Sequence, residues 1–104
     1  MGKYVFGYHG GGMAETEEEQ ARVMAAWGSW MGELGSALTD PGNAIMQAKT
    51  VNADGTITDG GGANPLTGYS IVEANSLDGA IALAKGCPIF ESGGSVEVAE
   101  TIEM

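Results

Sequence analysis

The sequence predicts an α+β fold in which two helices cover one face of an antiparallel sheet. Three observations lead to this prediction: a strand–helix–strand pattern over residues 67–98, a strand and a capped amphipathic helix in the first third, and turn-forming residues between them. The expected order is strand, helix, strand with a hairpin extension, strand, helix and strand. This βαββαβ order builds a four-stranded sheet with helices on one side.

The strand–helix–strand pattern has chemical signals at each of its boundaries. Residues 69–73 are rich in aromatic and β-branched side chains, which favours a strand. Ser76 can cap the next helix because its hydroxyl accepts from a free backbone N–H. Gly86 and Pro88 indicate the end of that helix. Residues 95–98 alternate between polar and apolar side chains, which predicts the last strand.

The first strand is expected over residues 3–8 and ends at the glycine triplet 10–12. Side chains alternate across a strand, so two sets of residues face opposite ways. Tyr4, Phe6 and Tyr8 form one set, and Val5, Gly7 and His9 form the other. No Lys-Ser/Thr pair follows the triplet, which disfavours a phosphate loop.

The first helix is expected to begin at Thr16 and to run to about residue 37. Thr16 and Glu19 have the spacing of a capping box, in which each side chain satisfies a free backbone N–H. One face of this helix is apolar. It carries Val23, Trp27, Trp30, Met31, Leu34 and Leu38.

The middle of the chain is expected to form a turn and a hairpin. Residues 39–43 are dense in turn-forming side chains. Residues 45–51 are predicted to be the second strand of the sheet, and residues 52–55 turn it back into 56–58. Residues 59–65 form a glycine-rich loop.

Composition restricts the class of function. The chain has 104 residues, which is the size of one domain, and its net charge of −10 disfavours binding to nucleic acid or an anionic membrane. No apolar run reaches transmembrane length. The single cysteine, Cys87, excludes an internal disulfide and indicates a reducing compartment, so a cytoplasmic protein is expected. We expect Cys87 to be a buried structural thiol.

Two helices leave the second face of the sheet without cover. Apolar residues occur on both faces of the predicted strands. An isologous homodimer would cover the second face, and this is the most common oligomer symmetry.

Several segments carry a resemblance to a known family. They are KYVFGYHG at the start, DGTITDGG in the middle, GYSIVEANSLDGAIALAKGCP after it, and GGSVEV near the end. On the basis of these segments, the chain resembles the YCII-related superfamily, in its DGPF-domain branch, over residues 1–104. The resemblance implies a ferredoxin-like dimeric α+β barrel with a pocket, and it leaves open whether that pocket is catalytic.

The chain departs from the family pattern in two places. The Asp-Gly-Pro-Phe motif aligns with residues 59–62, where only Asp59 and Gly60 match. The YCII branch carries a histidine on the first helix and an aspartate in the following turn. Here the helix has no histidine at residues 27–30, and Asp40 occupies the turn.

The candidate catalytic residues are His9 and Asp40. Imidazole titrates near neutrality, as acid–base catalysis requires, and a carboxylate such as Asp40 could orient it. The alternative is that His9 is a surface or hydrogen-bonded histidine at a strand end.

The candidate ligand-binding residues are Trp27, Trp30, Asn43, Asn64 and Tyr69. Trp27 and Trp30 share a helical face and either form a pocket wall or belong to the core. One histidine and one cysteine do not make a zinc site, so neither a metal nor another cofactor is expected.

Two functional hypotheses remain. In the first, a homodimer binds a small organic molecule between the first helix and the sheet and catalyses proton transfer or hydrolysis with His9 and Asp40. In the second, the protein is a non-catalytic ligand-binding module or a regulatory module that interacts with another protein.

Overall fold

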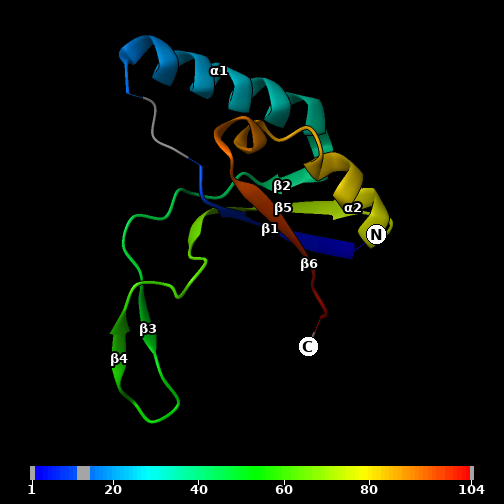
Figure 1. Ribbon diagram of the computed structural model, residues 1–104. Coiled ribbons are helices and arrows are strands. Elements are labelled where there is room, and N and C mark those ends of the chain that lie inside the picture. The colour runs from blue at the N-terminus through cyan, green and yellow to red at the C-terminus, as the bar shows by residue number, and fades with distance from the viewer. Residues whose placement is uncertain (1, 12–14, 104) are drawn as a thin grey trace.

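The computed structural model describes residues 2–11 and 15–103 and has two layers, a sheet and a pair of helices on one of its faces (Figure 1). The main sheet is antiparallel with strand order β2-β5-β1-β6. Its strands are β1 (Gly2–His9), β2 (Leu38–Asp40), β5 (Leu66–Ala74) and β6 (Ser95–Glu100). The helices are α1 (Glu17–Leu34) and α2 (Leu77–Ala84), with short 3-10 helices η1 (Gly35–Ala37) and η2 (Pro88–Ser92). This is the predicted α+β, ferredoxin-like arrangement.

Both helix starts follow from the local sequence. The Thr16 hydroxyl accepts from the Glu19 N–H at 3.1 Å, and the Ser76 hydroxyl accepts from the Gly79 N–H at 3.0 Å. The first helix ends earlier than predicted. Gly35 adopts φ 55° and ψ −128°, which stops α1 at Leu34.

The core lies between the helices and one face of the sheet. β1 contributes Tyr4, Phe6 and Tyr8, as the predicted alternation requires, and α1 contributes Trp30 and Leu34. Val72, Ala80, Ala84, Cys87 and Ile89 complete most of the buried cluster. Cys87 is 3% exposed, so the predicted buried thiol is confirmed.

The opposite face of the sheet carries the other set of side chains. Val5 lies opposite Ile71 of β5 and Ala99 of β6, so these residues form an apolar row on that face. Both helices lie on the far side of the sheet (Figure 1).

The prediction for the second strand was wrong. The sheet takes Leu38–Asp40, rather than residues 45–51, as its edge strand. Leu38 was assigned to the helix, but it pairs with Val72 and packs against the core. The physical reason is that Gly35 releases the chain from α1 early enough for Leu38 to reach the sheet. Beyond β2, Ala44 still pairs with Gly68 through a single bridge.

The predicted hairpin exists, but it lies outside the main sheet. β3 (Lys49–Val51) pairs with β4 (Ile57–Asp59) in a separate two-stranded sheet. Figure 1 shows this β3–β4 hairpin extending away from the two layers. Its Val51 and Ile57 are 72% and 65% exposed.

No helix in the described part of the chain is long and apolar enough to cross a membrane.

Candidate functional site

A pocket of about 490 Å³ lies between α1 and one end of the sheet. Its helical wall consists of Val23, Met24, Trp27, Gly28 and Met31. The opposite wall comes from the ends of β1 and β5 and the loop after β2, and it includes Tyr8, Gly10, Gly11, Pro41–Ala44 and Thr67–Tyr69. Ile89 and Ser92 of η2 close one side.

Gly42 brings the loop after β2 against β5. Its φ is 75°, and a Cβ built there would lie 1.6 Å from the Tyr69 carbonyl oxygen. No other residue fits this approach. The Asp40 carboxylate accepts from the Gly42 N–H at 2.8 Å, which stabilises the same turn.

Tyr8 forms the aromatic floor of the pocket with Trp27. Their rings meet edge to face with centroids 5.0 Å apart, an arrangement favoured by the ring quadrupoles. The Tyr8 hydroxyl donates to Ser70 Oγ at 2.8 Å, and Ser70 donates to the Pro41 carbonyl at 2.7 Å. Burial is the main reason why the pKa of Tyr8 is raised to about 12. Tyr8 is therefore a neutral phenol at physiological pH.

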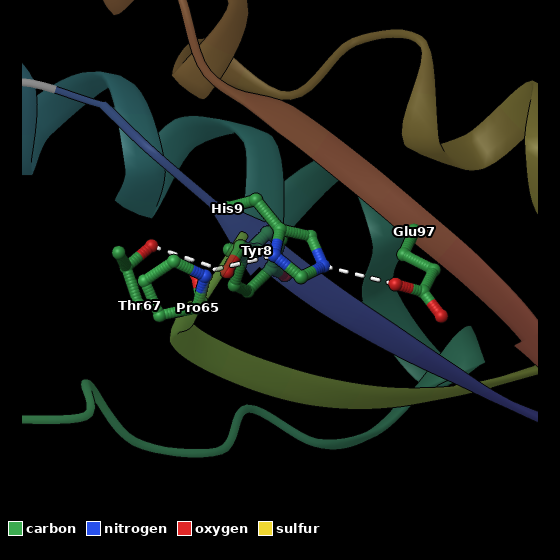
Figure 2. A network of polar contacts seen from close by, with 5 residues as sticks. All are labelled: Tyr8, His9, Pro65, Thr67 and Glu97. Atoms are coloured by element: carbon green, nitrogen blue, oxygen red, sulfur yellow. Dashed lines mark hydrogen bonds and ion pairs between the residues drawn. The ribbon is translucent and has the colours of Figure 1, made fainter. Parts of the chain in front are cut away.

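His9 lies on the sheet face opposite the helices and does not line the pocket. Its ring is held from both sides (Figure 2). Nδ1 lies 3.2 Å from the Pro65 carbonyl oxygen, and Nε2 lies 2.9 Å from Glu97 Oε1. The residue is only 7% exposed.

The structure does not pair His9 with Asp40. The carboxylate beside His9 is that of Glu97, while the Asp40 carboxylate accepts a hydrogen bond from the Gly42 N–H. The reason is the strand register: Glu97 lies directly across from Gly7, on the face that His9 shares. The expected orienting role therefore falls to Glu97 instead of Asp40.

The predicted ligand-binding residues separate into two groups. Trp27, Asn43 and Tyr69 line the pocket, and Asn43 Nδ2 donates to the Tyr69 hydroxyl at 3.3 Å. Trp30 is 4% exposed in the core and Asn64 is exposed, and neither borders the pocket.

Sequence reasoning did not assign Gly42, Gly68 or Met24 to the pocket, although all three border it. Clusters of glycine at strand ends were the available signal, because glycine leaves the backbone open to a ligand.

The comparison with protein families finds one match, which covers nearly all of the chain. The model of the YCII-related domain matches residues 5–104. The chain belongs to the YCII-related domain family.

A solved structure has the same fold as this YCII-related chain. It is 5-chloro-2-hydroxyhydroquinone dehydrochlorinase (TftG) from Burkholderia phenoliruptrix AC1100, in complex with 2,5-dihydroxybenzoquinone. The identity is 16% and the TM-score 0.55, and the match covers 96% of this chain and 95% of that one. A search of curated proteins finds no match.

The YCII-related chain has no charged side chain among the described residues that line the pocket. Within residues 2–11 and 15–103, no three His, Cys, Asp or Glu side chains lie close enough together to hold a metal ion. The walls instead combine aromatic rings, methionines and exposed backbone. Such a surface suits an uncharged, flat molecule.

Proposed function

We propose that this YCII-related protein binds a small, flat, uncharged organic molecule between α1 and the sheet. The observation that carries the proposal is the pocket of about 490 Å³, whose described lining is uncharged and largely apolar. An apolar cavity of about 150 Å³ already holds benzene, so a substituted ring fits here. A strongly anionic ligand would meet a chain of net charge −10 with no counter-charge in the described walls.

A hydroxylated aromatic ring is the first class of ligand to test. The dehydrochlorinase with the same fold is named for a hydroxylated aromatic ring, 5-chloro-2-hydroxyhydroquinone, and is described in complex with 2,5-dihydroxybenzoquinone. The aromatic floor formed by Tyr8 and Trp27 supports the same class, because edge-to-face and stacked contacts favour flat rings. We therefore take simple phenols as probes.

Acid–base catalysis is the second candidate. It is supported by a histidine–carboxylate pair at the end of β1, next to the pocket residues Tyr8 and Gly10. His9 and Glu97 would then take the roles first considered for His9 and Asp40. Binding without catalysis has the better support, since His9, Glu97 and Asp40 do not line the pocket of one chain.

A second copy of this chain is the proposed partner for the open sheet face. Val5, Ile71 and Ala99 form an apolar row there, and both helices lie on the other side. Pairing of the two faces would bury this row in both copies.

Light scattering after size-exclusion chromatography should give twice the chain mass. Ile71→Glu should give the single mass, whereas Ile102→Glu, at an 83% exposed position, should not. A single mass for the unchanged protein would contradict the proposed dimer.

Two glycines of α1 offer a matched test of the pocket. A Cβ at Gly28 or at Gly32 would have no neighbour within 4 Å, but only Gly28 lines the pocket. Gly28→Leu should fill the pocket, and Gly32→Leu should leave it open. Both changes improve helix propensity, so neither should unfold the chain.

The two tryptophans provide the readout. In an NMR titration with phenol, the indole N–H signal of Trp27 should move, because Trp27 lines the pocket. The signal of Trp30 should stay, since its N–H is bonded to the Leu83 carbonyl in the core. Gly28→Leu should weaken binding at least about tenfold, which is about 1.4 kcal/mol. Absence of saturable binding by phenols, or equal weakening by Gly32→Leu, would contradict the proposal.

A further inference from the structure

Both ring nitrogens of His9 face hydrogen-bond acceptors. Nδ1 lies 3.2 Å from a backbone carbonyl oxygen, that of Pro65, and Nε2 lies 2.9 Å from a carboxylate oxygen, that of Glu97 (Figure 2). Neither oxygen carries a proton that it could donate to the ring when the Glu97 carboxylate is ionised. A neutral imidazole carries one N–H and an imidazolium carries two.

The number of protons on the His9 ring therefore determines how many of these two contacts can be hydrogen bonds. With a neutral ring, one of the two contacts would set a nitrogen lone pair against an oxygen lone pair. With an imidazolium, both nitrogens donate, and the bond to Glu97 becomes charge-assisted. Only an imidazolium would donate a hydrogen bond in both of these contacts.

Within one chain, Glu97 is the charged side chain that contacts the ring among the described residues. From the segment entering β5 come Pro65, Leu66 and Thr67, which are uncharged. On β1 itself, the titratable neighbour is Tyr8, which points to the other face and bonds Ser70. On β6 the partner carboxylate belongs to Glu97, whose side chain is 67% exposed.

A glycine makes room for this contact. A Cβ at Gly7 would lie 2.8 Å from Leu66 Cδ2 and 3.8 Å from the Nε2 of His9. The ring therefore lies in the hollow above Gly7, between Leu66 and Glu97.

The ring joins two segments that continue into the pocket wall. His9 lies between Tyr8 and Gly10, and both of these line the pocket. Pro65 leads into Thr67, another lining residue. The Thr67 hydroxyl lies 3.2 Å from the carbonyl oxygens of both Tyr8 and Gly10, so it reinforces the junction.

We propose that the His9–Glu97 pair is a proton-dependent positioning element for this wall of the pocket. The protonated ring holds the end of β1 to Pro65 and to β6. When the ring loses a proton, one of the two bonds is lost, and the wall formed by Gly10 and Thr67 loosens. Ligand affinity is then lower when the ring is neutral than when it carries both protons. The effect on affinity depends on the proposed binding function, but the proton-dependent contact does not.

The ring can be observed directly, because His9 is the only histidine of the chain. ¹⁵N NMR of the imidazole should show protons on both nitrogens at pH 6. Glu97→Gln keeps the shape of the partner and removes its charge, so it should lower the doubly protonated fraction at pH 7 by about two- to fivefold, as for a partly exposed pair. Glu100→Gln makes the same charge change on β6 without a contact to His9 and should have little effect.

The pocket wall supplies the second readout. The amide signals of Thr67 and Gly68 should move with the ring signals between pH 5.5 and 8.5. Phenol stays uncharged over this range, and its affinity should fall about two- to fivefold as the pH rises. The pH dependence should change in Glu97→Gln and persist in Glu100→Gln.

Three results would overturn this inference. They are a singly protonated ring at pH 6, a ring that titrates without moving the Thr67 and Gly68 amides, and equal effects of the two glutamine variants. If phenol does not bind at all, the proposed function fails for this ligand class. The ring and amide signals still decide the role of the His9–Glu97 pair.

Discussion

The indole N–H of Trp30 donates a hydrogen bond to the carbonyl oxygen of Leu83 at 3.1 Å, and this bond connects α1 to the last turn of α2. The last carbonyls of a helix have no partner within it, so the indole satisfies one of them. Gly86 permits the approach, because a Cβ there would lie 3.2 Å from the Trp30 ring.

Replacing Trp30 should therefore reduce stability more than binding. Trp30→Phe removes the donor to Leu83 and part of a side chain that is 4% exposed. We expect a loss of about 2–3 kcal/mol in the free energy of unfolding, measured with urea. Phenol affinity in the folded variant should be nearly unchanged.

Replacing Trp27 by Phe should instead reduce ligand binding more than stability. Trp27 lines the pocket and is only half-buried. Its replacement should weaken phenol binding severalfold and cost less stability than Trp30→Phe. The opposite ranking of the two variants in both assays would disprove this division of roles.

Two glycines, Gly32 of α1 and Gly42 of the loop after β2, should respond in opposite ways to replacement by alanine. Gly32→Ala adds a methyl group in open space on α1 and should stabilise the protein by about 0.5–1 kcal/mol. Gly42→Ala would place its Cβ on the Tyr69 carbonyl and should destabilise the protein by several kcal/mol or prevent folding. Thermal unfolding of both variants measures this contrast, and a stable Gly42→Ala would contradict the turn geometry.

Tyr8 predicts a loss of stability in alkaline solution. Burial raises the pKa of its phenol from 10.0 to about 12, so the folded state favours the neutral form. This contribution is complete below pH 10 and is lost as the pH rises towards 12. It amounts to about 3 kcal/mol, since the shift is about two pKa units and each unit corresponds to about 1.4 kcal/mol.

Tyr8→Phe separates this effect from other alkaline transitions. The variant should lose about 1 kcal/mol at pH 7, because Ser70 loses its bond to the phenol. Between pH 10 and 12 its free energy of unfolding should fall less steeply than that of the unchanged protein. Parallel curves for the two proteins would contradict the pKa shift.

Cys87 should react slowly in the folded protein. Its thiol is 3% exposed, and burial raises its pKa from 9.0 to about 11. The thiolate is the reactive form, so ionisation alone slows labelling at pH 8 about 100-fold relative to an ordinary thiol. A chromogenic disulfide reagent should therefore label native protein slowly and urea-unfolded protein fast. Equal rates in the two states would contradict this prediction.

The elements with strong local signals were predictable. Thr16 and Ser76 cap the two helices through contacts with residues three positions away. The signal for such a contact is local in the sequence. The alternation in β1 also correctly put Tyr4, Phe6 and Tyr8 on one face, and the structure shows that this face is buried. The second strand was not predictable in the same way. Leu38–Asp40 is short, and its place at the sheet edge depends on pairing with β5.

The candidate site depends more than the individual elements do on contacts between residues that are far apart in the sequence. His9 was a predicted site residue, but its partner Glu97 is 88 residues away in the sequence. Only the β1–β6 register puts this carboxylate beside the ring. Trp27 and Trp30 show a similar limit, since both lie on one helical face but only Trp27 borders the pocket. Spacing alone did not distinguish them, because that depends on where α2 and η2 pack.

The β3–β4 hairpin has a practical use in studying this protein. Its turn at residues 52–55 points away from both layers, and residues 45–66 do not line the pocket (Figure 1). Exposed turns of this kind tolerate inserted sequence. A fluorescent label or an affinity peptide placed between Ala53 and Asp54 would therefore attach the molecule to a sensor surface by one end, with its cavity facing the solution.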